Sequence, residues 1–172
     1  MRAFLLIGIT SIIFSCSNKN PTVQISTEMG DIILEVYSDK APVTSANFLA
    51  YVDSGKYDNK SCFYRTVRMD NQSNSPVKIE VIQGGFYEDS LIEKYQFAEI
   101  NHETTKETDV LHNDGVISMA RGLVGTASSE FFICIGKQPE LDFSGKRNPD
   151  GQGFAAFGKV IKGMEIVRKI QH

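Results

Sequence analysis

An arginine and a glutamine lie eighteen residues apart, each in a strand-like stretch of the chain. Arg65 ends the segment 63–65 (FYR), and Gln83 begins the segment 83–85 (QGG). An arginine side chain keeps its charge at all physiological pH values, and its planar fork donates several hydrogen bonds. A glutamine amide both donates and accepts. Together the two segments are expected to place a guanidinium beside a side-chain amide.

Further along the chain, two more regions complete the pattern. Residues 118–121 (SMAR) and 128–134 (SSEFFIC) form one region, and residues 153–160 (GFAAFGKV) form the other. In this order and spacing the segments resemble the cyclophilin family of peptidyl-prolyl cis-trans isomerases, from about Val23 to Ile170. The resemblance implies a mainly β fold, a closed or nearly closed antiparallel β-barrel with two capping helices.

The implied reaction is rotation about an X-Pro bond, which is slow because rotation breaks amide resonance. At the top of the barrier the prolyl nitrogen regains its lone pair. A donor aimed at this nitrogen stabilises the transition state more than either ground state. The resemblance implies that Arg65 is this donor and that Gln83 holds Arg65 and the substrate carbonyl. Such chemistry requires no nucleophile, metal or cofactor.

The substrate proline ring needs an apolar pocket. The resemblance places Val81, Phe132, Leu141 and Phe154 around the ring. It also places Ala120 and Arg121 along the backbone of the bound peptide. Taken alone, Phe132 and Leu141 are more typical of ordinary core packing, and the matching motif is what favours the pocket.

Several positions depart from the family pattern. Glu130 replaces the glutamine that usually precedes the two phenylalanines, and we expect its carboxylate near Arg65, either positioning or diverting the guanidinium. Activity is then expected to survive at a lower level, and Glu130→Gln to raise the rate. Tyr64 and Phe154 stand where many members have histidine, and Glu80 aligns with a pocket aromatic.

Three other residues bear on ligands. Glu140 stands where cyclosporin-sensitive members carry a tryptophan, so the expected cyclosporin binding is weak or absent. His102 and His112 are ten residues apart, which matches no common zinc pattern. They are therefore interpreted as surface or hydrogen-bonded histidines, and no metal site is predicted.

The remaining pattern predicts the elements that position these residues. Strands are expected at 23–27, 32–37, 63–67, 79–83, 116–120, 131–135 and 154–160, helices at 42–53 and 163–170, and surface segments at 68–78, 91–109 and 142–153. The family's final strand, which pairs with the first strand and closes the barrel, is apparently missing. The first strand then has an unpaired edge, either in a less stable domain or in a truncated sequence.

Length and composition are ordinary for one soluble domain. The chain has 172 residues, 41% of them hydrophobic and 23% charged. Its net charge is −3, with no basic stripe. Nucleic acid is an unlikely partner, because phosphate binding needs clustered lysines and arginines.

The N-terminus has the pattern of an export signal. Arg2 precedes an almost entirely apolar run to Phe14, and residues 13–16 (IFSC) resemble a bacterial lipobox. The predicted organisation is a signal peptide at 1–15, a lipidated Cys16 with a tether to residue 22, and an isomerase domain at 23–172. A plain secretory signal and an uncleaved apolar N-terminus are the alternatives. The favoured location is the cell envelope, lipid-anchored and facing the periplasm.

Two cysteines remain in the predicted domain. Cys62 and Cys134 either form a disulfide or are two small buried hydrophobic residues, and their apolar neighbours favour the second interpretation.

The predicted function is isomerisation of X-Pro bonds in exported proteins. A proline-peptide binding module or chaperone with weak or no catalysis is the alternative from another class, and a structural lipoprotein is the third.

Overall fold

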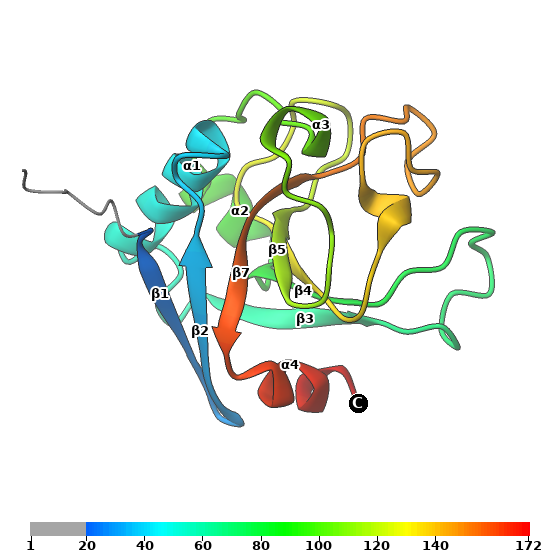
Figure 1. The fold of residues 1–172 in the computed structure, drawn as a ribbon. Helices are drawn as coiled ribbons and strands as arrows, with labels where there is room; N and C mark the ends of the chain where they lie inside the picture. The colour runs from blue at the N-terminus through cyan, green and yellow to red at the C-terminus, as the bar shows by residue number, and fades with distance from the viewer. Residues whose placement is uncertain (1–19) are drawn as a thin grey trace, which may run out of the picture.

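The computed structural model describes residues 20–172, which fold around one curled antiparallel sheet (Figure 1). The signal peptide predicted at 1–15 and the lipidation predicted at Cys16 lie outside the described residues. The strands are β1 (Thr22–Thr27), β2 (Gly30–Val36), β3 (Ser61–Val67), β4 (Val81–Phe86), β5 (Val116–Met119), β6 (Phe131–Cys134) and β7 (Ala155–Lys162). Their order across the sheet is β1-β2-β7-β5-β6-β4-β3.

Helices occupy the two ends of the curled sheet (Figure 1). They are α1 (Pro42–Asp53), α2 (Asp89–Tyr95), α3 (Thr105–Thr108) and α4 (Met164–Gln171), with a short 3-10 turn η1 (Pro139–Leu141). Because β2 leads into α1, β7 leads into α4, and these two strands are antiparallel, α1 and α4 lie at opposite ends. The two capping helices predicted from the sequence are thereby confirmed.

The surface segment at 91–109 contains two helices that the sequence did not predict. It includes most of α2, which has no buried residue, and all of α3. Helix α3 begins at a capping box, in which the Thr104 hydroxyl accepts from the Glu107 backbone N–H and the Glu107 carboxylate accepts from the Thr104 N–H. Such local hydrogen bonds stabilise a short helix that has little apolar periodicity.

The apolar core lies inside the curl of the sheet. Alternate residues of β2 face it, so that Ile32, Leu34 and Val36 are fully buried. Aromatic rings from α1 and β7 fill the centre, with the Phe48 and Phe157 ring centroids 5.0 Å apart. Successive residues of β6 point to opposite faces, which puts a second apolar cluster on the outer face of the sheet.

The barrel is open along one side. β1 and β3 are the two ends of the strand order and do not pair with each other within residues 20–172, which confirms the predicted barrel without a closing strand. Between them runs a groove of about 930 Å³, lined by both edge strands, by α1 and by Ile170 of α4. The sheet is therefore a seven-stranded half-barrel.

The two cysteines of the domain are both free thiols. Cys134 on β6 is fully buried, as interpreted from the sequence, and burial raises the pKa of its thiol well above the usual range. The same interpretation is wrong for Cys62, because it lies on the edge strand β3 and is exposed.

Between residues 20 and 172, no helix is both long enough and apolar enough to span a bilayer.

Candidate active site

Three predicted site residues lie in one row across three neighbouring strands. Arg65 on β3 is opposite Gln83 on β4, and Gln83 is opposite Phe132 on β6. Residues that are directly opposite in a sheet project from the same face, and neighbouring strands are about 4.8 Å apart. The backbone of Arg65 is thus roughly 10 Å from that of Phe132, on the outer face of the half-barrel. Arg65 itself is exposed.

A bulge in β3 changes the direction of the side chain beside Arg65. The register passes from Phe63 opposite Gly84 to Arg65 opposite Gln83, so two steps on β3 match one step on β4. Tyr64 is the extra residue. A β-bulge re-aims the side chains around it, which here lets Tyr64 and Arg65 both reach Gln83.

These side chains form a continuous chain of hydrogen bonds. Arg65 Nη1 donates to Gln83 Oε1 at 2.9 Å, and Gln83 Nε2 donates to the Tyr64 hydroxyl at 2.7 Å. The Tyr64 hydroxyl in turn donates to Glu130 Oε2. The other carboxylate oxygen, Oε1, accepts from the Phe86 N–H at 3.0 Å and from the Ser129 hydroxyl at 3.2 Å.

Burial affects the titration of both ends of the Tyr64–Glu130 contact. It raises the pKa of the Glu130 carboxyl above its ordinary value, while the hydrogen bonds that the carboxylate accepts oppose this shift. Burial, followed by the hydrogen bond to Glu130, also raises the pKa of the Tyr64 phenol. Tyr64 is therefore a neutral donor over the whole physiological pH range.

Glu130 does not contact the Arg65 guanidinium directly, although the sequence placed the two residues close together. Among residues 20–172, the Arg65 guanidinium forms no ion pair, and its hydrogen-bond partner is Gln83. The bulged Tyr64 stands between the two charged groups. Glu130 is linked to the guanidinium only through Tyr64 and Gln83.

The predicted pocket residues gather beside this row. Val81, Phe132 and Leu141 are buried in the outer apolar cluster, and Ala120 and Phe154 pack against it. The Phe132 and Phe154 rings meet edge to face, with centroids 5.3 Å apart and an interplanar angle of 89°. The structure thus brings together the five residues expected to hold or flank a proline ring.

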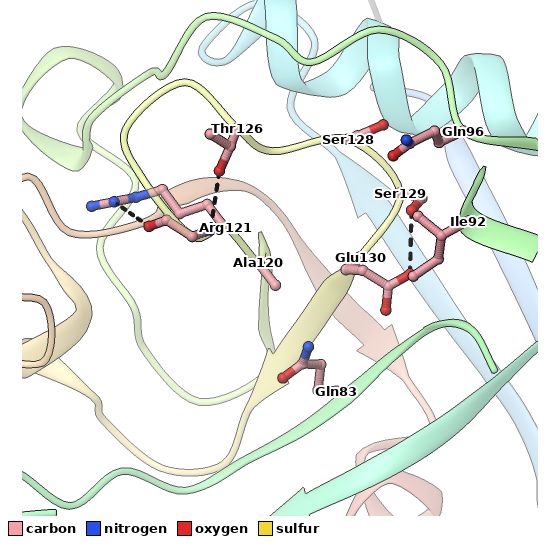
Figure 2. A pocket seen from close by; sticks show the side chains of 10 residues that line it. Gln83, Ile92, Gln96, Ala120, Arg121, Thr126, Ser128, Ser129 and Glu130 are labelled. Atoms are coloured by element: carbon pink, nitrogen blue, oxygen red, sulfur yellow. Dashed lines mark hydrogen bonds between the residues drawn. The ribbon is translucent and has the colours of Figure 1, made fainter. Parts of the chain in front are cut away.

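A hollow of about 260 Å³ adjoins the row on the side of α2. Figure 2 shows Gln83, Ala120 and Glu130 around this hollow, with the Ser129 hydroxyl directed at the Glu130 carboxylate. Arg121 extends away from Gln83 in the same view. The site therefore combines an exposed cationic donor, an apolar cluster and an adjoining hollow.

Comparison with known proteins gives the family. The model of the cyclophilin type peptidyl-prolyl cis-trans isomerase/CLD family matches residues 22–172. The chain belongs to the cyclophilin family. A peptidyl-prolyl cis-trans isomerase of Acinetobacter baylyi is 34% identical over 152 residues, which cover 88% of this chain and 72% of that protein. Isomerase B of Escherichia coli is 32% identical, with 87% and 83% covered.

Solved structures agree on the fold. A Cryptosporidium parvum cyclophilin, determined in the presence of the dipeptide Ala-Pro, has a TM-score of 0.67 and 24% sequence identity. The alignment covers 88% of this chain and 85% of that one. The family match and the sequence relatives identify the chain as a cyclophilin-type peptidyl-prolyl cis-trans isomerase, so the prediction of an enzyme of this class is confirmed.

In this cyclophilin, Arg121 lines the hollow beside the site together with Ala120, but its guanidinium is occupied by contacts within the protein. Its guanidinium pairs with Asp150 through two hydrogen bonds of 2.8 and 2.9 Å, and it also donates to the Gly153 carbonyl. The Arg121 side chain is only 1% exposed, and its guanidinium carbon lies 5.4 Å from the Phe154 ring centroid. Arg121 therefore ties loop 142–153 to the wall of the pocket.

The histidines are hydrogen-bonded, as interpreted from the sequence. His112 lies under the Phe132 ring, with centroids 6.0 Å apart, and its two ring nitrogens contact Asp142 and Ser118. His102 Nε2 contacts the Gln152 carbonyl. Within residues 20–172, no cluster of three or more histidine, cysteine or carboxylate side chains could hold a metal ion.

The sequence reasoning missed two residues of this site. Tyr64 was treated as a tolerated substitution, yet its hydroxyl connects Gln83 to Glu130. Arg147 was not considered, yet burial and the nearby Arg65 charge lower the pKa of its guanidinium, which donates to the Val77 carbonyl at 2.5 Å. No local sequence signal identifies either residue. The contacts of Tyr64 depend on a bulge, and those of Arg147 depend on how two long loops pack together.

Proposed function

We propose that this isomerase uses Arg65 as the donor to the prolyl nitrogen and the outer apolar cluster as the proline pocket. The row of Arg65, Gln83 and Phe132 is the observation that supports this mechanism. An exposed guanidinium held by an amide stands on the same face as a buried aromatic ring, so a substrate proline on Phe132 presents its nitrogen toward Arg65. Gln83 Oε1 restrains one arm of the guanidinium fork. The other arm remains for the twisted imide.

The test is the rate of cis-trans exchange in a proline tetrapeptide, measured by exchange NMR. Removing a single preorganised donor costs an enzyme roughly 10²- to 10³-fold in rate, and Arg65→Ala is expected to lose about that much. Arg65→Lys keeps the charge but not the planar fork, and should recover only part of the loss. The matched control is Arg168→Ala on α4, where an exposed arginine pairs with Asp114. Unchanged exchange in Arg65→Ala contradicts the mechanism, and tight peptide binding without exchange in the unaltered protein favours a binding module.

We also propose that the substrates are exported proteins and that the enzyme is attached to the cell envelope through a lipidated Cys16. The sequence supports this proposal, because the apolar run up to Phe14 ends immediately before the cysteine and a polar spacer follows. Expression of the full chain in a bacterium supplied with labelled palmitate should give a labelled membrane-bound protein. Cys16→Ser should abolish the label. An unlabelled protein that still carries Cys16, or a label that persists in Cys16→Ser, refutes the anchor and leaves the enzymatic mechanism untouched.

A further inference from the structure

The hydrogen-bond chain that ends on Arg65 has a fixed direction. A carboxylate only accepts hydrogen bonds, so Glu130 requires the Tyr64 hydroxyl to donate to it. The single proton of Tyr64 is then used, and its oxygen accepts from Gln83 Nε2 at 2.7 Å. This contact leaves the carbonyl oxygen of the Gln83 amide to face Arg65. The negative charge on Glu130 thereby decides which end of the amide meets the guanidinium.

We propose that Glu130 and Tyr64 are positioning residues that orient the Gln83 amide and so aim Arg65, and that protonation of Glu130 weakens catalysis by removing this orientation. The inference rests on the proposed role of Arg65 as the donor to the prolyl nitrogen. It also replaces the sequence-based expectation that Glu130→Gln raises the rate.

The packing around Glu130 determines which oxygen takes the proton. Oε1 already accepts the Phe86 backbone N–H and the Ser129 hydroxyl, and a backbone donor cannot reverse. The proton therefore goes to Oε2, which then faces the Tyr64 hydroxyl as a donor. Tyr64 no longer has to direct its own proton at Glu130, and the Gln83 amide is free to turn its NH₂ group toward Arg65. A donor facing a donor gives no hydrogen bond, so the guanidinium loses its restraint.

In this cluster, Glu130 is the acid whose pKa burial raises toward neutral pH. The titratable groups facing it are Tyr64 and Cys62 on β3 and Tyr57 after α1, and the Arg65 guanidinium lies beyond Tyr64. The pKa values of the two tyrosines and of the cysteine are all raised above ordinary values that already exceed 8, and arginine stays charged. Ile92 on α2 and Gln96 at its C-terminal cap line the adjoining hollow and carry no charge.

One further titratable group packs against the site from the opposite side. His112 lies under Phe132, with its ring nitrogens directed at Asp142 and Ser118. Its hydrogen bonds lie at the pocket floor and do not involve Gln83 or Glu130.

The experiment is a pH profile of kcat/KM by exchange NMR on a proline tetrapeptide, from pH 4.5 to 8. The full chain is used for the unaltered protein, Tyr64→Phe, Glu130→Gln and the control Tyr87→Phe, which changes an exposed tyrosine that does not belong to the series of hydrogen bonds. In the unaltered protein the rate should fall roughly two- to tenfold on acidification, the loss that corresponds to one hydrogen bond. The midpoint should lie above the ordinary glutamate value of about 4.3, because burial raises the pKa of Glu130.

The variants separate the hydrogen-bond chain from a simple charge effect. Glu130→Gln must keep its carbonyl oxygen on the Phe86 N–H, so its NH₂ faces Tyr64 and mimics the protonated acid. Its rate should be flat with pH and should equal the low-pH rate of the unaltered protein. Tyr64→Phe should also be flat, although Glu130 is still present. Tyr87→Phe should follow the unaltered profile.

Several outcomes overturn the inference. A pH step that survives in Tyr64→Phe but is absent in Glu130→Gln means that Glu130 acts on Arg65 through space, and a step that survives in both variants means that another group causes it. A flat profile in the unaltered protein, or a faster Glu130→Gln, removes the switch altogether. If a variant does not fold, the side-chain amide signals of Gln83 in the unaltered protein decide instead, since they must titrate with the midpoint of kcat/KM. Absence of catalysis at every pH, or full activity of Arg65→Ala, contradicts the proposed function itself. Neither result can be mistaken for failure of the hydrogen-bond switch alone.

Discussion

Replacement of Asp150 by asparagine tests the role found for Arg121. The carboxylate accepts two hydrogen bonds from a guanidinium that is 1% exposed, whereas Asp150 itself is 34% exposed. Asparagine keeps one acceptor oxygen and loses the charge and the second bond. Hydrogen bonds to charged groups contribute about 1.5–3 kcal/mol each, and partial exposure of Asp150 reduces this value. We expect Asp150→Asn to lower the free energy of unfolding by about 1–3 kcal/mol.

The effect should depend on pH in a defined direction. The hydrogen bond from Arg121 and a second bond from the Gln152 backbone lower the pKa of Asp150 to about 2. The unfolded value is about 3.9. A carboxyl whose pKa is lower in the folded state stabilises the fold above the unfolded value, and this stability is lost as the pH falls through the folded value. The difference between the unaltered protein and Asp150→Asn should therefore be complete above about pH 5 and should shrink toward pH 2.

Urea unfolding followed by circular dichroism at pH 7, 4 and 3 measures this difference. The matched control is Asp70→Asn, which breaks another arginine–aspartate pair. In that pair Arg68 is 33% and Asp70 is 74% exposed, so the cost should be much smaller than that of Asp150→Asn. Equal costs for the two variants, or a cost for Asp150→Asn that is the same at pH 7 and pH 3, would refute the reasoning.

Two further predictions concern the pocket. Phe132→Leu and Phe131→Leu change adjacent residues on opposite faces of β6, and each should cost on the order of 1 kcal/mol of stability. Phe132→Leu should raise KM for a proline tetrapeptide severalfold while Phe131→Leu leaves KM unchanged, and equal KM values for the two variants would exclude Phe132 from the pocket. Glu140 lies in η1, where its carboxylate accepts the Lys146 N–H, and offers no indole to cyclosporin. We expect inhibition only at micromolar or higher concentration, and a nanomolar inhibition constant would contradict this.

The resemblance to the family predicted that the site residues come together, and strand register explains why they do. Once residues 63–67, 79–83 and 131–135 are assigned to neighbouring strands, the alternation of side chains sets Arg65, Gln83 and Phe132 on one face. The apolar cluster follows for the same reason, because Val81 is two residues from Gln83 on β4. The alternation of side chains along a strand is regular, so the face on which each residue lies follows from its position in the strand.

The sequence did not predict contacts that depend on irregular backbone or on the reach of long side chains. A bulge at Tyr64 leaves no mark in the pattern of residue types, so the separation of Glu130 from Arg65 was not expected. The partner of Arg121 lies 29 residues away in a loop, and the conformation of that loop is itself set by the pairing. The short helix α3 depends on one capping box rather than on periodicity.

The open side of the half-barrel has a consequence for how the protein behaves in solution. An edge strand exposes a row of backbone N–H and C=O groups, and any extended chain can pair with it. β1 carries no lysine and no proline between Thr22 and Thr27, so nothing in the strand discourages such pairing. Outward-facing amides of β1 are expected to exchange with deuterated water far faster than those of the central strand β5. Concentrated samples should self-associate through this edge more readily than a fully closed barrel does.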